Sequence, residues 1–289
     1  MALSTGLLLL IIGIIAGGYG TIVGAGGGFI FVPALLLIFH MNPAVASGSG
    51  LVIVLINSLS GVMGYAKQKK INYKTGLIIG ISALPGSLLG VWLLQSFSSQ
   101  YFFVVFATIL VALGLFLFSK NSPFARKAKT KQPVREIATA SASYNQAASG
   151  LEGAEAISYQ NTVAPQPEKN TQLQDKWLIP LGFIMGILSS YLGIGGGWLL
   201  VPILIYLFKV STHNATATSI FALCLYSLVG VISQLFYSSI DWSTVIWGGI
   251  GVIAGSQLGV ILSQRIPGKV IMQMLSILLV IIGVRMYFS

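Results

Sequence analysis

Two glycine runs are the residues whose type and spacing most clearly suggest chemistry. Gly24-Ala25-Gly26-Gly27-Gly28 is followed by Phe29, and Gly193-Ile194-Gly195-Gly196-Gly197 is followed by Trp198. Glycine adopts backbone angles that are closed to other residues and leaves its amide uncovered, so such a run can unwind a helix inside a bilayer. A short apolar segment follows each run and predicts a helix whose N-terminus carries partial positive charge. The pattern therefore predicts an anion site built from backbone N–H groups.

Small hydroxyl side chains follow both short segments. Ser47 and Ser49 come after the first segment, and Thr216, Thr218 and Ser219 come after the second. As a set they are candidate donors to the same anion. Any single one of them could instead bond to the backbone of its own helix, as Ser and Thr often do in lipid.

The composition requires a membrane to place these residues. Of the 289 residues, 55% are apolar and 8% are charged, whereas roughly a quarter of the residues of a soluble domain are charged. Residues 1–66, 75–119 and 177–208 contain no Asp, Glu, Lys or Arg. Each stretch is long enough for one or more helices of about 20 residues. The sequence thus predicts an all-α, multi-pass protein of the cytoplasmic membrane.

An internal repeat relates the two glycine runs. Gly24 and Gly193 are 169 residues apart, and the same offset relates Val32-Pro33 to Val201-Pro202 and continues through most of each half. The repeat predicts two transmembrane units, residues 1–118 and 177–289. Residues 119–176 between them are polar, and they are expected to form a largely disordered cytoplasmic linker. Composition favours a plain tether over a regulatory segment.

Each half is expected to contain four full transmembrane helices and one short or re-entrant helix that begins at the glycine run. The predicted helices are near residues 3–22, 28–39, 43–66, 75–95 and 100–118, and near residues 177–191, 197–208, 212–236, 243–263 and 268–288.

The basic residues favour inverted repeats over parallel ones. An odd number of crossings in each half leaves only Arg285 on the outer side, whereas a parallel arrangement exposes Lys209, Arg265 and Lys269. Basic residues collect in cytoplasmic loops, so the inverted arrangement fits better. It also predicts that the linker is cytoplasmic.

Other conspicuous residues have simpler explanations. Glycines with four-residue spacing are typical of closely packed membrane helices, as in Gly13–Gly17, Gly20–Gly24, Gly86–Gly90 and Gly251-Gly255-Gly259. His40 and His213 are candidate proton carriers, but an interfacial position is favoured. Asp241 is expected to cap a helix, Cys224 to be a packed thiol, and Tyr73, Trp177 and Trp242 to be interface anchors.

The sequence resembles the TauE/SafE sulfite exporter family, also called the toluene sulfonate uptake permease family. The resemblance rests on three glycines, a few apolar residues and then Val-Pro, in both halves, and it covers nearly everything outside the linker. Ala217-Thr218-Ser219 is a second matching element, but its first-half counterpart is Gly48-Ser49-Gly50, so equal contributions from the two halves are in question. The prolines are expected to break the short helices. The resemblance implies transport of sulfur anions such as sulfite, sulfoacetate or related organosulfonates, with no cofactor.

Three classes of function remain to be compared. A secondary anion transporter, most simply an exporter, fits the glycine runs and an interior without acidic side chains, which a cation carrier would need. A passive anion channel of the same architecture remains the alternative. An intramembrane enzyme is disfavoured because no nucleophile elbow, metal-ligand spacing or phosphate loop is present. Nucleic-acid binding is disfavoured because the basic residues flank apolar spans. The expected partners are therefore a small sulfur anion and the lipid bilayer, and no metal site is expected.

Overall fold

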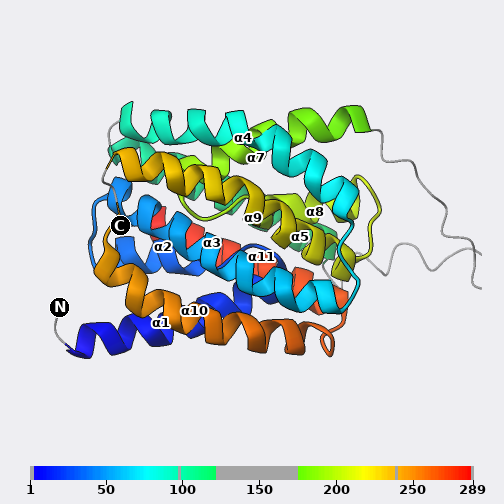
Figure 1. Ribbon diagram of the computed structural model, residues 1–289, viewed down its shortest axis with the longest axis horizontal. Helices are drawn as coiled ribbons and strands as arrows, with labels where there is room; N and C mark the ends of the chain where they lie inside the picture. Colours follow the sequence, from blue (N-terminus) through cyan, green and yellow to red (C-terminus); the bar gives the residue numbers. More distant parts are fainter. Residues whose placement is uncertain (1–2, 97–98, 122–174, 238–239, 288–289) are drawn as a thin grey trace, which may run out of the picture. The chain divides into compact units, whose positions relative to one another are not determined.

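The structure is a computed structural model that describes residues 3–96, 99–121, 175–237 and 240–287. All secondary structure in these residues is helical (Figure 1). Most of the predicted linker lies outside the described residues. The helices are α1 (Leu3–Val23), α2 (Gly28–Leu37), α3 (Pro43–Lys67), α4 (Tyr73–Ser96), α5 (Ser99–Asn121), α7 (Asp175–Leu192), α8 (Gly197–Tyr206), α9 (Thr212–Phe236), α10 (Trp242–Ser263) and α11 (Gly268–Tyr287).

The helix starts have local causes that can be read in the sequence. Asn42 precedes α3, and its side-chain oxygen accepts a hydrogen bond from Ala44 N at 2.9 Å, while Pro43 occupies the first helical position. Asp241 caps α10 in the same way, because Oδ1 accepts from Ser243 N at 3.1 Å. The cap predicted for Asp241 is confirmed.

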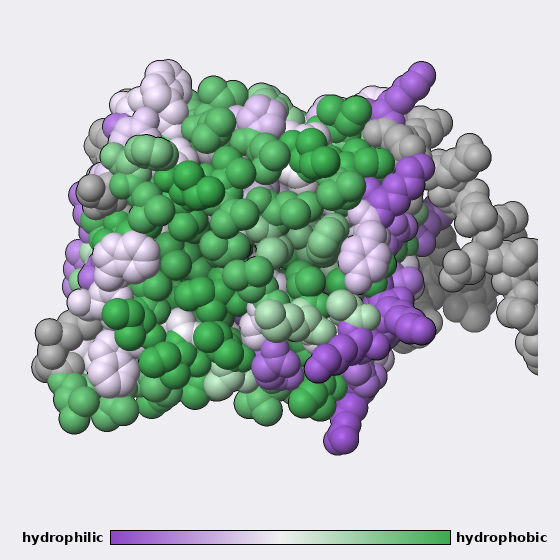
Figure 2. Space-filling model, viewed as in Figure 1, coloured by the Kyte–Doolittle hydropathy of each residue, from purple (hydrophilic) through white to green (hydrophobic). Residues whose placement is uncertain are grey.

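Six helices are long and apolar enough to cross a membrane: α1, α3, α4, α9, α10 and α11. The other four have shorter apolar stretches within the described residues, so the predicted set of eight full spans is supported for six helices only. Large side chains such as Ile11, Ile81 and Ile250 are more than half exposed. The visible face is apolar between its two edges, with hydrophilic side chains gathered mainly at one edge (Figure 2). Such a surface suits lipid and not water.

The helices of the two predicted halves interleave in one compact unit. α1 packs against α10 and α4 packs against α7, so each of these pairs takes one helix from each half. α3 also packs against α9, and α5 packs against α11. Neither half therefore completes its packing without the other.

Glycine makes the two closest helix contacts possible. A Cβ built on Gly17 would lie 2.8 Å from Val252 Cα, and one on Gly255 would lie 2.8 Å from Gly18 N. Gly86 meets the backbone of α7 in the same manner, 3.0 Å from Phe183 C. The packing role predicted for the spaced glycines is confirmed at these positions, where the helix backbones touch directly.

Helices in the same place in the two halves run in opposite directions (Figure 1). α3 runs from left to right in this view, whereas α9 runs from right to left. α4 and α10 are opposed in the same way, and the segment rich in lysine after α3 lies at the right, where α9 begins. The edge with most hydrophilic side chains in Figure 2 is on this same side.

The prolines do not break the short helices, contrary to expectation. Pro33 and Pro202 lie inside helices that continue to Leu37 and Tyr206. Each proline is close to the helix start, where loss of one N–H removes only one early hydrogen bond. The helices end instead at a left-handed residue, His40 with φ 49° and Lys209 with φ 54°. Each end is closed by a backbone hydrogen bond, from Met41 N to Leu35 O at 3.1 Å and from Val210 N to Leu204 O at 3.0 Å.

Candidate functional site

Both glycine runs are unwound and buried. α1 ends at Val23 and α2 begins at Gly28, while α7 ends at Leu192 and α8 begins at Gly197. Within these breaks φ is positive at four glycines, with 81° at Gly24, 81° at Gly26, 71° at Gly193 and 78° at Gly195. Side chains rarely adopt these angles, so glycine is required there. We call residues 24–27 the first glycine loop and residues 193–196 the second glycine loop.

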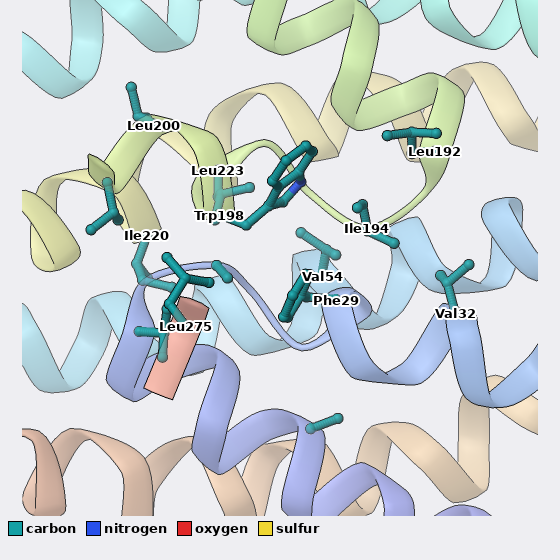
Figure 3. Packing of buried hydrophobic residues seen from close by; sticks show 14 of the residues in the cluster. Phe29, Val32, Val54, Leu192, Ile194, Trp198, Leu200, Ile220, Leu223 and Leu275 are labelled. Atoms are coloured by element: carbon teal, nitrogen blue, oxygen red, sulfur yellow. The ribbon is translucent and has the colours of Figure 1, made fainter. Parts of the chain in front are cut away.

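The two glycine loops lie against each other in the middle of the helical unit (Figure 3). A Cβ built on Gly28 would lie 2.8 Å from Gly193 O, and one on Gly195 would lie 3.1 Å from Ala25 O. Gly197 packs against Gly24 O so closely that no side chain fits. The structure thus brings together the two runs that are 169 residues apart in the sequence.

Several loop amides already have partners within the protein. Ala25 N and Gly26 N donate to Gly20 O at 2.9 and 3.2 Å, and Gly193 N donates to Ser189 O at 2.9 Å. The amides of Gly28 and Gly197, the first residues of the short helices, donate no hydrogen bond within the described part of the chain. This is the usual condition of a helix N-terminus and leaves these donors available to a ligand.

Two polar side chains hold the loops from below. Tyr226 on α9 accepts a hydrogen bond from Gly196 N through its hydroxyl oxygen at 3.1 Å. Asn57 on α3, with its amide oriented to satisfy both of its atoms, accepts from Gly27 N at 3.2 Å and donates to Gly17 O at 3.1 Å. The amides of Gly27 and Gly196 are therefore occupied by the protein itself and are not open to an anion in this structure.

Further buried hydroxyls extend both supports. Thr21 Oγ1 donates to Ser256 Oγ at 3.1 Å, which links α1 to α10 beside Asn57. In the other half, Ser87 Oγ and Ser190 Oγ lie 2.6 Å apart and link α4 to α7 beside Tyr226. Sequence reasoning missed all six residues. The signal that could have found them was the 169-residue offset, which relates Thr21 to Ser190, Asn57 to Tyr226 and Ser87 to Ser256.

Three of the five predicted hydroxyl residues lie at the glycine loops. Ser219 Oγ donates to Gly24 O at 2.9 Å, and Ser47 Oγ donates to Tyr191 O at 3.2 Å, just before the second loop. A Cβ built on Gly24 would lie 2.9 Å from Thr216 Cα, so Thr216 also touches the first loop. The buried hydroxyl of Thr216 has no hydrogen-bond partner in the described structure.

The remaining two hydroxyls support other segments. Ser49 Oγ accepts from Asp241 N at 3.0 Å, and Thr218 Oγ1 accepts from Asn72 N at 3.0 Å. These bonds fix the connections that lead into α10 and α4. The structure therefore gives Ser49 and Thr218 a structural partner away from the glycine loops.

The two residues that follow the glycine runs are fully buried. Phe29 and Trp198 are both 0% exposed, and Trp198 is among the largest buried side chains. Trp198 Nε1 has no hydrogen-bond partner in the described structure, although indole N–H groups usually find one when buried. Trp198 lies over the second loop near Leu223, and Phe29 lies beside Val54 (Figure 3).

The other singled-out residues lie apart from the loops. His40 is an exposed turn residue, and His213 is partly exposed in the first turn of α9, so both are near the ends of their segments. Cys224 is half-buried in α9. Within the described residues, no group of three His, Cys, Asp or Glu side chains could hold a metal ion. The site is thus made of amides, hydroxyls and apolar side chains.

Comparison with known proteins agrees with this architecture. The family described as Sulfite exporter TauE/SafE matches residues 9–286. The probable membrane transporter protein YunE of Bacillus subtilis is 30% identical, over 98% of this chain and 97% of its own length. A probable membrane transporter protein of Methanocaldococcus jannaschii is 29% identical, over 96% of this chain and 94% of its own. No solved structure matches significantly. The chain belongs to the TauE/SafE family of multi-pass membrane transporters, which are not enzymes.

Proposed function

We propose that this transporter moves small sulfur-containing anions, such as sulfite, sulfoacetate or related organosulfonates, out across the cytoplasmic membrane. The observation that carries the proposal is the meeting of two unwound glycine loops, one from each half, among buried helices. The family description names sulfite export, which supports the choice of substrate.

The chemistry of the loops favours an anion. The amides of Gly28 and Gly197 lack partners, and the helices that they begin direct partial positive charge toward the loops. The membrane interior between residues 1 and 66 contains no acidic side chain, and the same holds between residues 177 and 208. A cation would find only backbone carbonyls there, whereas an anion finds N–H and O–H donors.

We further propose that the halves are inverted repeats that alternate between two conformations around the loops. The bounds of α2 and α8, and those of α3 and α9, differ by the same 169 residues as the glycine runs. Equivalent helices run in opposite directions, and the contact of α1 with α10 matches that of α7 with α4. Inverted repeats with broken helices at their interface are a recurring design of secondary transporters. The basic residues after α3 and before α9 then face the cytoplasm.

Flux into liposomes that contain the purified protein tests the substrate. Labelled sulfite and sulfoacetate should enter faster than they enter empty liposomes, and unlabelled sulfite should compete. Entry no faster than in empty liposomes for every sulfur anion would refute the proposed substrate class. It would leave the membership of the transporter family untouched.

A passive channel of the same architecture is the second candidate, and it is separated by counterflow. A carrier loaded inside with unlabelled substrate takes up label faster, because its return step is no longer empty. A pore shows no such stimulation. The absence of a printed open path through the buried glycine loops, which are closed to solvent in this structure, favours the carrier.

A further inference from the structure

Two buried serines without partners lie close to the glycine loops, at the same place in each half. Ser58 is on α3 and Ser227 is on α9, and both are 0% exposed. Neither hydroxyl has a hydrogen-bond partner in the described structure. The two positions differ by the 169 residues that separate the glycine runs. One unpartnered hydroxyl could be accidental, but the repetition calls for a common cause.

Serines elsewhere in the membrane helices satisfy themselves. Ser82 Oγ donates to Ile78 O at 2.7 Å, and Ser96 Oγ donates to Trp92 O at 2.9 Å, one turn back in the same helix. Thr108 does the same with Val104 O at 2.7 Å. A carbonyl one turn back is within reach of any helical serine, so this bond was open to Ser58 and Ser227 too. A buried hydroxyl without a partner costs free energy, which an absent ligand would recover.

The packing places both serines next to the loops. Val54 lies one turn before Ser58, and its side chain would meet a Cβ on Gly26 at 3.3 Å and one on Gly195 at 3.1 Å. Leu223 lies one turn before Ser227, and it would meet the same two positions at 3.5 and 2.9 Å. Residues four apart share a helix face, so each serine continues the face that covers the glycine loops.

The register of α3 against α9 brings the two serines together. A Cβ on Gly230 would lie 3.3 Å from Leu51 Cδ1, and one on Gly61 would lie 3.1 Å from Ile220 Cγ2, so the helices are antiparallel. In that register Ser58 lies across from Leu223, and Ser227 lies across from Val54. The serines therefore flank the Val54–Leu223 contact from either side, on the line between the two glycine loops (Figure 3).

We propose that the hydroxyls of Ser58 and Ser227 are direct ligands of the transported anion, one donor from each half. The proposal rests on the proposed function and adds specific side chains to it. Both hydroxyls are closed to solvent here, so this structure holds the pair in an occluded arrangement between Val54 and Leu223. A sulfonate or sulfite oxygen reaching them would replace partners that the protein does not supply.

The test compares Ser58→Ala and Ser227→Ala with Ser60→Ala in the full-length protein. Ser60 is a matched control on α3, because its buried Oγ already accepts from Gln257 Nε2 at 2.7 Å. Sulfite and methanesulfonate serve as probes, and half-saturating concentrations are measured by flux. Thermal unfolding without a probe is measured alongside. Ser58→Cys and Ser227→Cys keep the side-chain size while removing the strong donor.

Each alanine or cysteine variant should raise the half-saturating concentration about tenfold or more, as expected for a hydrogen bond to a charged group. Its unfolding temperature should be unchanged or higher, because the protein loses no internal bond. Ser60→Ala should show the opposite, with lower stability and wild-type affinity. Unchanged affinity in both serine variants, beside an active wild type, would overturn the proposal and indicate a buried water at most. A wild type that moves neither probe would instead refute the proposed substrate class, and with it this proposal.

Discussion

Asn57 and Tyr226 occupy the same place in the two halves and do the same work with different side chains. Each accepts a hydrogen bond from the amide just before a short helix, Gly27 N at 3.2 Å for Asn57 and Gly196 N at 3.1 Å for Tyr226. The supports hold the glycine loops open without using any charged group. Their chemistry differs enough that the two halves can be tested separately.

Replacement of Tyr226 by Phe should loosen the second glycine loop. The substitution keeps the ring but removes the acceptor of Gly196 N, and an unsatisfied buried amide costs about 1–3 kcal/mol. We expect a lower unfolding temperature and slower transport. Thermal unfolding in detergent and flux in liposomes measure the two effects. Tyr73→Phe, at a side chain that is 53% exposed, is the matched control and should change neither. Equal behaviour of the two variants would show that the hydroxyl of Tyr226 carries no load.

Adjacent glycines of the first loop should differ sharply in their tolerance of alanine. Gly26 has φ 81°, so Gly26→Ala should destabilise the protein by about 1–2 kcal/mol through backbone strain. Gly27 has φ −64°, and its Cβ would meet Ile53 at an ordinary 3.4 Å, so Gly27→Ala should keep wild-type stability. Unfolding temperatures of the two variants decide the matter. Equal losses would mean that the loop conformation described here is wrong.

The contact of α1 with α10 should depend on glycine at one position of α10 and not at another. In Gly255→Val the side chain would overlap the backbone of α1, including Gly18 N at 2.8 Å, so little folded protein should reach the membrane. A Cβ on Gly249 meets only the tip of Ile56 at 3.0 Å, so Gly249→Ala should insert and unfold like wild type. Yield and unfolding temperature after extraction are the readouts, and a well-folded Gly255→Val protein would contradict the packing.

Single cysteines can decide whether the halves are inverted. The protein has one cysteine, so Cys224→Ala gives a clean background. Lys74 and Ser243 are equivalent exposed positions, at the starts of α4 and α10. Inversion predicts that a membrane-impermeant thiol reagent labels Ser243→Cys in intact cells and labels Lys74→Cys only after lysis. Labelling of both from the same side would establish parallel repeats instead.

Much of the fold follows from the sequence, because helix length and polar caps are local properties. The predicted range 212–236 is the observed α9, and the break before Gly197 follows from glycines that adopt positive φ. The pairing of α1 with α10 could not be predicted, because glycine spacing shows which faces pack closely without naming the partner. Pro33 was misjudged for a positional reason, since a proline near a helix start costs little.

The candidate site was predicted less completely than the fold. The glycine runs stood out by composition, whereas Asn57 and Ser227 are single polar residues inside apolar helices and looked like ordinary packing. Their roles depend on the contact between α3 and α9, which joins residues far apart in the chain. Ser49 and Thr218 were chosen as donors by position, but both accept backbone hydrogen bonds at the helix connections instead.

The central claim, that the anion binds where the two glycine loops meet, can be tested most directly with Trp198. This indole is fully buried in the first turn of α8, and the protein has four other tryptophans that can be replaced by Phe. In a variant that keeps only Trp198, sulfite or sulfoacetate should change the fluorescence saturably, over the concentrations that saturate flux. A companion variant that keeps only the exposed Trp242 should show no change. A silent Trp198 in a protein that still transports the anion would place the binding site elsewhere.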